Sequence, residues 1–125
     1  MTGPATMRVR NDALVGAVLG RVVGMLAARA QCPIDRLDDA LLLTDAVSAH
    51  AGKHTKTGTV RVDIDAGESG LELRIGELRS GGAEAMLHDA ALPGVGNVLE
   101  RVADEIEPRG GPDGDELILR LRFAG

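Results

Sequence analysis

Apolar and polar residues alternate in three segments of the chain, a period of two that is typical of strands with one buried and one solvent-facing side. These segments span residues 60–65, 71–75 and 117–123. Residues 67–70, with a glycine at each end, read as a turn, so the first two segments are expected to pair as a hairpin. A shorter alternation at residues 7–10 predicts an edge strand.

Other segments repeat apolar residues every three or four positions, as helices packed on a core do. One such stripe runs from Leu14 to Leu26, and a second helix is predicted over about residues 34–51, after the break at Pro33. Gly16, Gly20 and Gly24 recur on the first helix, which predicts close packing against a sheet, another helix or a partner, with a homodimer as one option.

The second helix turns polar after Leu43, which predicts that its end borders a cavity or an interface. A short helix is expected at residues 84–87. A further helix is predicted to open at residues 93–97 and to continue at helical spacing through Val98, Leu99, Val102 and Ile106. A short strand near Glu107 is the alternative for the end of that segment.

The resulting order of elements predicts an α+β fold, a two-layer α/β sandwich with a mixed, mostly antiparallel sheet and helices on one face. Residues 1–125 have room for one domain, and a single domain is expected.

Composition narrows the classes of function. The chain holds one Phe, no Tyr and no Trp, and its net charge is −5. Because single-stranded nucleic acid is usually bound by aromatic platforms in a basic groove, nucleic-acid binding is not expected. No apolar run approaches the ~20 residues of a membrane helix and no signal-peptide pattern opens the chain, so a cytoplasmic protein is expected. Cys32 stands alone and is expected to be an ordinary, unreactive thiol.

The order of elements also resembles that of the histidine-kinase-like (GHKL, Bergerat-fold) ATPases, and in particular their anti-sigma-factor serine kinase branch. Residues 34–42 resemble the start of the second helix of this family, and residues 92–106 resemble its glycine motif and third helix. The resemblance covers nearly the whole chain and rests on order and spacing. It implies a bacterial regulator of transcription that binds ATP and Mg²⁺ and switches between protein partners.

The first family motif places a catalytic Glu on the second helix and a Mg²⁺-binding Asn one turn later. Here those positions read Asp45 and Ala49, or Ala46 and His50 if the register shifts by one. Alanine cannot bind a metal, and histidine suits a hard cation poorly. In either register the pair is incomplete.

The second motif normally reads Asp-x-Gly-x-Gly and contacts adenine. Glu77 stands at the Asp position and Arg79 at the first Gly position, with Gly81 and Gly82 able to supply the bend two residues late. The third motif is a phosphate-binding Gly-x-Gly at a helix N-terminus. Gly94 and Gly96 keep that spacing and Asn97 follows them, with an ordinary structural turn as the alternative.

The chain is therefore interpreted as a degenerate member, a pseudokinase. It is expected to act as an anti-sigma-factor-like regulator through protein–protein binding, with a sigma factor or an anti-sigma antagonist as partner and with ATP binding and kinase activity weakened or lost. Candidate partner surfaces are the polar end of the second helix, the glycine-lined first helix and the loop at residues 52–59 with its basic side chains Lys53, His54 and Lys56.

Two alternatives stay open. One is an active ATP-dependent serine/threonine kinase that uses Asp45 as base and Glu77 to bind adenine, with ATP and Mg²⁺ as cofactors. The other is a small-anion or metabolite-binding domain built around residues 94–97. No metal site is expected, because the spacing of His50, His54 and His88 matches no strong ligand pattern.

Overall fold

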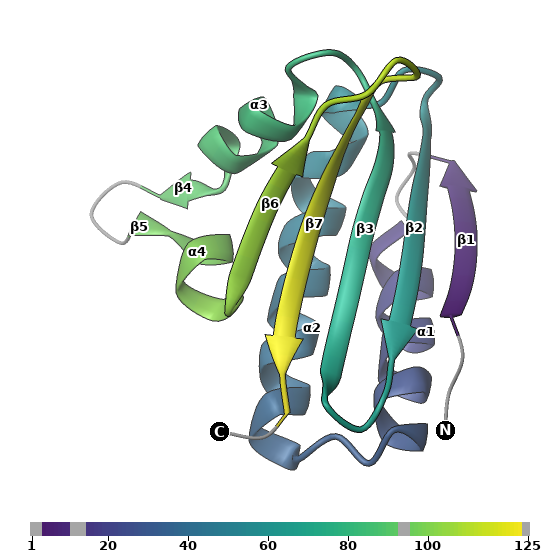
Figure 1. Cartoon of the computed structure of the whole chain (residues 1–125), viewed down its shortest axis with the longest axis vertical. Coiled ribbons are helices and arrows are strands. Elements are labelled where there is room, and N and C mark those ends of the chain that lie inside the picture. Colours follow the sequence, from purple (N-terminus) through teal and green to yellow (C-terminus); the bar gives the residue numbers. More distant parts are fainter. Residues whose placement is uncertain (1–3, 11–14, 93–95, 124–125) are drawn as a thin grey trace.

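One layer of the molecule is a five-stranded sheet in the order β1-β2-β3-β7-β6, seen in the computed structural model (Figure 1). The structure describes residues 4–10, 15–92 and 96–123. All pairings between the described strands are antiparallel. The strands of the large sheet are β1 (Pro4–Arg10), β2 (Thr59–Ala66), β3 (Gly70–Leu78), β6 (Glu105–Arg109) and β7 (Asp115–Arg122).

Two long helices, α1 (Val15–Arg29) and α2 (Ile34–His50), form the second layer and cover one face of the sheet (Figure 1). A 3₁₀ turn, η1 (Ala51–His54), follows α2. Beside β6 lie α3 (Gly82–Asp89), the two-residue strands β4 (Ala91–Leu92) and β5 (Gly96–Asn97), and α4 (Val98–Val102). The predicted α+β two-layer sandwich is confirmed. Among the described helices, none is long and apolar enough to span a bilayer.

The core between the layers is almost entirely aliphatic. The inward positions of three strands follow the period of two seen in the sequence. On β2 and β3 burial alternates along the strand, and the predicted hairpin between them is confirmed. The helices contribute the opposite side of the core through residues such as Leu19, Val23, Leu43 and Val47. The single aromatic residue, Phe123, is buried at the end of β7.

The predicted continuation of the fourth helix to Ile106 is wrong, and the alternative of a strand near Glu107 is confirmed. Helix α4 ends at Val102, and Ile106 pairs with Leu119 in the ladder between β6 and β7. A four-residue apolar spacing suits a helix, but β7 needs a hydrogen-bonding partner on its second side, and the tertiary pairing outweighs the local period.

Arginine and glutamate side chains cover the outer face of the sheet, opposite the helices. The Arg61 guanidinium lies against Gly76, where a Cβ atom would come within 2.0 Å of its Nη2, and reaches Glu116 at 2.9 Å. Arg120 is held by Glu72 at 2.9 Å. Exposed ion pairs contribute ~0–1 kcal/mol each, so this network mainly keeps the bare sheet face soluble and charged.

Asp104 joins the end of α4 to both layers. Its carboxylate accepts hydrogen bonds from the backbone N–H of Arg122 at 2.6 Å and from the Arg36 side chain at 2.5 Å. The Arg122 N–H, and then the Arg36 charge, lower the pKa of Asp104 below its ordinary value. A lowered folded-state pKa stabilises the fold above the unfolded value, and this stabilisation is lost as the pH falls through the folded value.

We expect Asp104→Asn to lower the free energy of unfolding at pH 7 by roughly 0.5–1 kcal/mol, a figure that allows for solvent screening. Only at a pH below the lowered folded-state pKa of Asp104 should the two proteins become nearly equal in stability, because the wild-type carboxylate is then protonated in both states. Urea denaturation at a series of pH values from about 7 down to about 2 measures both differences. Asp38→Asn is the control, since Asp38 is exposed and has no ion pair with another described residue; an equal loss in that variant would contradict the assignment.

Candidate functional site

The loop after α2 and η1 approaches the end of β3 and the start of α3. The backbone N–H of Arg79 donates to the carbonyl of His54 at 2.7 Å, and that of Lys56 donates to the carbonyl of Glu77 at 2.9 Å. An isolated bridge between Thr55 and Leu78 continues this pairing. The loop after η1 is thereby fixed to the last residues of β3.

The C-terminal half of α2 presents its two candidate motif registers to different surroundings. Asp45 and Ala49 are exposed, and Asp45 has no hydrogen bond or ion pair with any residue of the described ranges. Ala46 is partly buried and packs against the core, and His50 is half-buried. The only carboxylate in these two registers therefore points into solvent, and the inward register carries Ala46 and His50.

A histidine–aspartate contact links η1 to α3. His54 Nε2 lies 2.6 Å from Asp89 Oδ2, and the His54 side chain is 13% exposed. The hydrogen bond from His54 is the main reason why the pKa of Asp89 lies below its ordinary value, with smaller contributions from the charges of His54, Lys53 and His50. Nothing in the sequence pointed to Asp89, because its partner lies 35 residues away.

His50 is close enough to this pair to influence Asp89 electrostatically. Its Nδ1 atom is buried and has no hydrogen-bond partner in the described part of the chain. An imidazole in this position can hydrogen-bond to a neighbouring group, but it does not supply the oxygen ligand that Mg²⁺ prefers.

Glu77 lies on the opposite side of the molecule from Asp45. The register of β3 against β7 shifts between Ile75 and Leu78, and Glu77 has a φ of 58°. Its carboxylate lies on the outer sheet face, 2.7 Å from Arg8 and 3.8 Å from Arg61. The hydrogen bond from Arg8 lowers the pKa of Glu77. The side chain of Leu78, not that of Glu77, turns into the core.

The two glycines after Arg79 shape the entry into α3. Gly81 has a φ of 80°, and its N–H donates to the Asp115 carboxylate at 2.9 Å. Gly82 is buried, and a Cβ there would lie 3.1 Å from the Leu78 Cβ and 3.2 Å from the His54 carbonyl. Both glycines are thus required by the turn and by packing.

The third predicted motif is only partly within the described residues: Gly94 lies outside them. Gly96, with a φ of 95°, is the first residue of β5 and pairs with Leu92 of β4. Asn97 caps α4, its side-chain oxygen accepting from the N–H of Glu100 at 3.2 Å while its amide donates to the carbonyl of Leu87 at 2.6 Å. Both ends of the Asn97 side chain are therefore engaged in structural hydrogen bonds.

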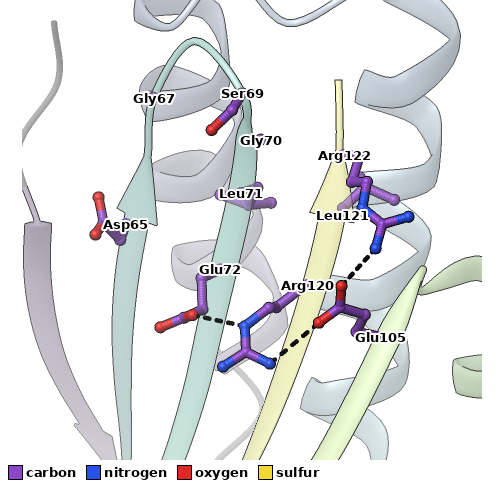
Figure 2. Close-up of a pocket in the computed structure, with 10 residues that line it drawn as sticks. All are labelled: Asp65, Gly67, Ser69, Gly70, Leu71, Glu72, Glu105, Arg120, Leu121 and Arg122. Atoms are coloured by element: carbon purple, nitrogen blue, oxygen red, sulfur yellow. Dashed lines mark hydrogen bonds and ion pairs between the residues drawn. The ribbon is translucent and has the colours of Figure 1, made fainter. Parts of the chain in front are cut away.

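A hollow of about 280 Å³ opens on the outer face of the sheet beside the β2–β3 turn (Figure 2). A chain of ion pairs crosses it, from Glu72 to Arg120 to Glu105 to Arg122. Each arginine is neutralised by a carboxylate, so the hollow offers no excess positive charge to an anion. None of the sequence-predicted site residues lines it.

Burial raises the pKa of the Cys32 thiol, which keeps it protonated and poorly nucleophilic. Across residues 4–10, 15–92 and 96–123, no three His, Cys, Asp or Glu side chains are grouped so that they could hold a metal ion.

Comparison with known proteins extends the structural description. No protein-family model and no curated protein matches the chain. A crystal structure of the RsbU and RsbW domains of Rv1364c from Mycobacterium tuberculosis superimposes with a TM-score of 0.71 at 13% identity, over 98% of this chain and 33% of that chain. The chain spans about a third of the solved chain it matches. Identity this low shows the fold alone, and that fold is the expected histidine-kinase-like ATPase fold, with a five-stranded antiparallel sheet backed by helices.

Proposed function

We propose that this protein is an anti-sigma-factor-like regulator that acts by binding a protein partner, with ATP binding and kinase activity weakened or lost. The observation that carries the proposal is the separation of Asp45 and Glu77. Asp45 projects from the solvent side of the helix layer, and Glu77 is held by Arg8 on the outer face of the sheet. Two carboxylates on opposite sides of a domain cannot bind one nucleotide.

The chemistry of phosphoryl transfer supports this proposal. Transfer depends on positioning the phosphates and on charge neutralisation by Mg²⁺. At the position of the metal ligand, Ala49 has no donor atom in one register, and in the other His50 is an imidazole where an oxygen ligand is needed. The ammonium group of Lys56, a basic side chain near the end of β3, donates a hydrogen bond to the backbone carbonyl of Asp113 at 2.8 Å.

The partner-binding half of the proposal rests on the fold and on the surface. The chain shares its fold with a structure that contains an RsbW domain. We propose a sigma factor or an anti-sigma antagonist as the partner. The exposed end of α2 and the loop at residues 52–59, with the exposed side chains of Lys53 and Lys56, are candidate contacts for an acidic surface.

Calorimetric titration of the protein with Mg-ATP tests the loss of nucleotide binding. We expect no saturable heat up to millimolar ATP, which corresponds to a binding free energy weaker than about −4 kcal/mol. Saturable one-site heat that disappears in Asp45→Ala and persists in Asp38→Ala, an equally exposed aspartate on the same helix, would show that the site is functional and overturn the proposal.

The partner is sought by co-purification with sigma factors and antagonists encoded in the source genome. We expect a complex that forms equally well with and without added Mg-ATP. A complex that requires ATP would instead support the active-kinase alternative.

A further inference from the structure

One flank of the molecule consists of the free edge of β1 and the side of α1 turned away from α2. Strand β1 ends the sheet and pairs only with β2 (Figure 1). We define the β1–α1 flank as residues 4–10 together with Val18, Arg21, Met25 and Arg29. This flank differs from the other described surfaces in its exposed apolar side chains and in its charge.

The helix contribution to this flank follows from spacing. Gly16 faces α2, because a Cβ there would lie 3.5 Å from the Ser48 Cβ. At 3.6 residues per turn, Val18, Met25 and Arg29 lie about 140–180° around the helix from Gly16. Val18 is 41% and Met25 53% exposed. Two large apolar side chains therefore stand in solvent on the side of α1 turned away from α2.

The charged side chains of β1 and α1 are all basic, and of these Arg8 is paired with Glu77 at 2.7 Å. Strand β1 contains Arg8 and Arg10, helix α1 contains Arg21 and Arg29, and neither element contains an acidic residue. Arg10, Arg21 and Arg29 are exposed and form no ion pair within the described residues. In contrast, the sheet-face arginines Arg61 and Arg120 are matched by carboxylates. In a protein of net charge −5, such unmatched charge of one sign selects an acidic partner.

The two edges of the sheet also differ. On β6, Pro108 removes a backbone donor, and the acidic Glu105 and Glu107 discourage an added strand. Strand β1 spans seven residues, and its only proline is its first residue. An open strand edge of this kind can accept an extended segment through main-chain hydrogen bonds, with side chains giving the specificity.

We propose that the β1–α1 flank binds an extended acidic polypeptide segment, which adds to β1 as a sixth strand of the sheet. Its acidic side chains would lie on the outer face beside the unmatched Arg10, and its apolar side chains on the inner face toward Val18 and Met25. A second copy of this chain fits poorly, because each copy brings the same four arginines to the contact. The inference deepens the proposed function by naming the surface and the chemistry of the partner.

The probe is a fluorescein-labelled synthetic peptide of about ten residues in which Glu and Val alternate. Fluorescence anisotropy should show saturable binding to the full chain, and a peptide with Lys in place of Glu should not bind. Arg10→Glu should raise the Kd about tenfold, and Arg29→Glu, which lies in the helix layer away from the acidic side chains, should raise it less. Arg109→Glu, the same charge change on the opposite edge strand, should leave the Kd within about twofold. Circular dichroism checks that each variant is folded.

Three outcomes would overturn the inference. An alternately N-methylated peptide, which cannot pair with a strand edge, should lose binding; equal affinity would exclude strand addition. A single-stranded oligonucleotide that binds with the same dependence on Arg10 and Arg29 would assign the flank to nucleic acid. A homodimer in sedimentation that is lost in Met25→Glu and competed by the peptide would assign it to a second copy. If the natural partner still binds Arg10→Glu normally, this inference fails while the proposed function stands.

Discussion

Gly114→Ala is expected to lower the free energy of unfolding by about 3 kcal/mol. Gly114 has a φ of 120°, a conformation that side chains rarely adopt, and a Cβ there would lie 2.4 Å from the carbonyl oxygen of Leu78. The obstructing atom is backbone, so it cannot swing aside. The β6–β7 loop would have to move away from the end of β3.

Thermal and urea denaturation of the variant measure this loss. Gly110→Ala is the matched control in the same loop, because its nearest neighbour is the Asp115 side chain at 3.6 Å and its φ is not in the left-handed region. We expect the control to change stability by less than about 0.5 kcal/mol. If the two variants were equally stable, the loop would not be held against β3 as the structure shows.

Leu78→Ala is expected to cost about 3 kcal/mol, through lost burial and the cavity left behind. The Leu78 side chain is completely buried, and it lies under the start of α3, where Gly82 approaches its Cβ. Because η1 and α3 both pack around this point, the loss should also loosen the contact between His54 and Asp89.

Denaturation of Leu78→Ala gives the change in stability, and the histidine ring resonances in NMR spectra report on the His54 contact. Leu42→Ala removes the same atoms from a leucine that is 49% exposed and should change stability by no more than about 0.5 kcal/mol. A small effect in Leu78→Ala with unchanged histidine resonances would mean that the neighbouring side chains fill the space.

The architecture could be predicted from the sequence because its pattern and its tertiary contacts agree. Val60, Val62 and Ile64 alternate with polar residues in the sequence and are buried in the structure. The turn at residues 67–70 gives the hairpin, and the apolar stripes give α1 and α2. In each case a local period coincides with the face that the element buries.

The orientation of Glu77 could not be predicted. Strict alternation from Ile75 would give Glu77 and Ile75 the same face, but the register shift between Ile75 and Leu78 turns Glu77 outward. A one-residue irregularity exchanges the faces of every following side chain. The long-range partner Arg8, 69 residues away, has no counterpart in any local pattern.

The register of the α2 motif also depends on tertiary packing. Asp45 and Ala46 are neighbours in the sequence, and spacing alone allowed either to stand at the catalytic position. The two residues differ in burial, since Asp45 is exposed and Ala46 packs against the core. Local spacing likewise does not distinguish a helical from a stranded Ile106, because the competing β7 ladder is formed by residues that come later in the chain.

The helix layer has a consequence for how the protein meets other molecules. The charged side chains of α1 are all arginines, whereas the neighbouring α2 carries four aspartates, Asp35, Asp38, Asp39 and Asp45. The layer is therefore an electric dipole whose axis runs across the two helices. In the field of a charged partner such a dipole rotates the protein before contact, so that fewer encounters are misaligned. This alignment should fade as salt shortens the Debye length below about 10 Å.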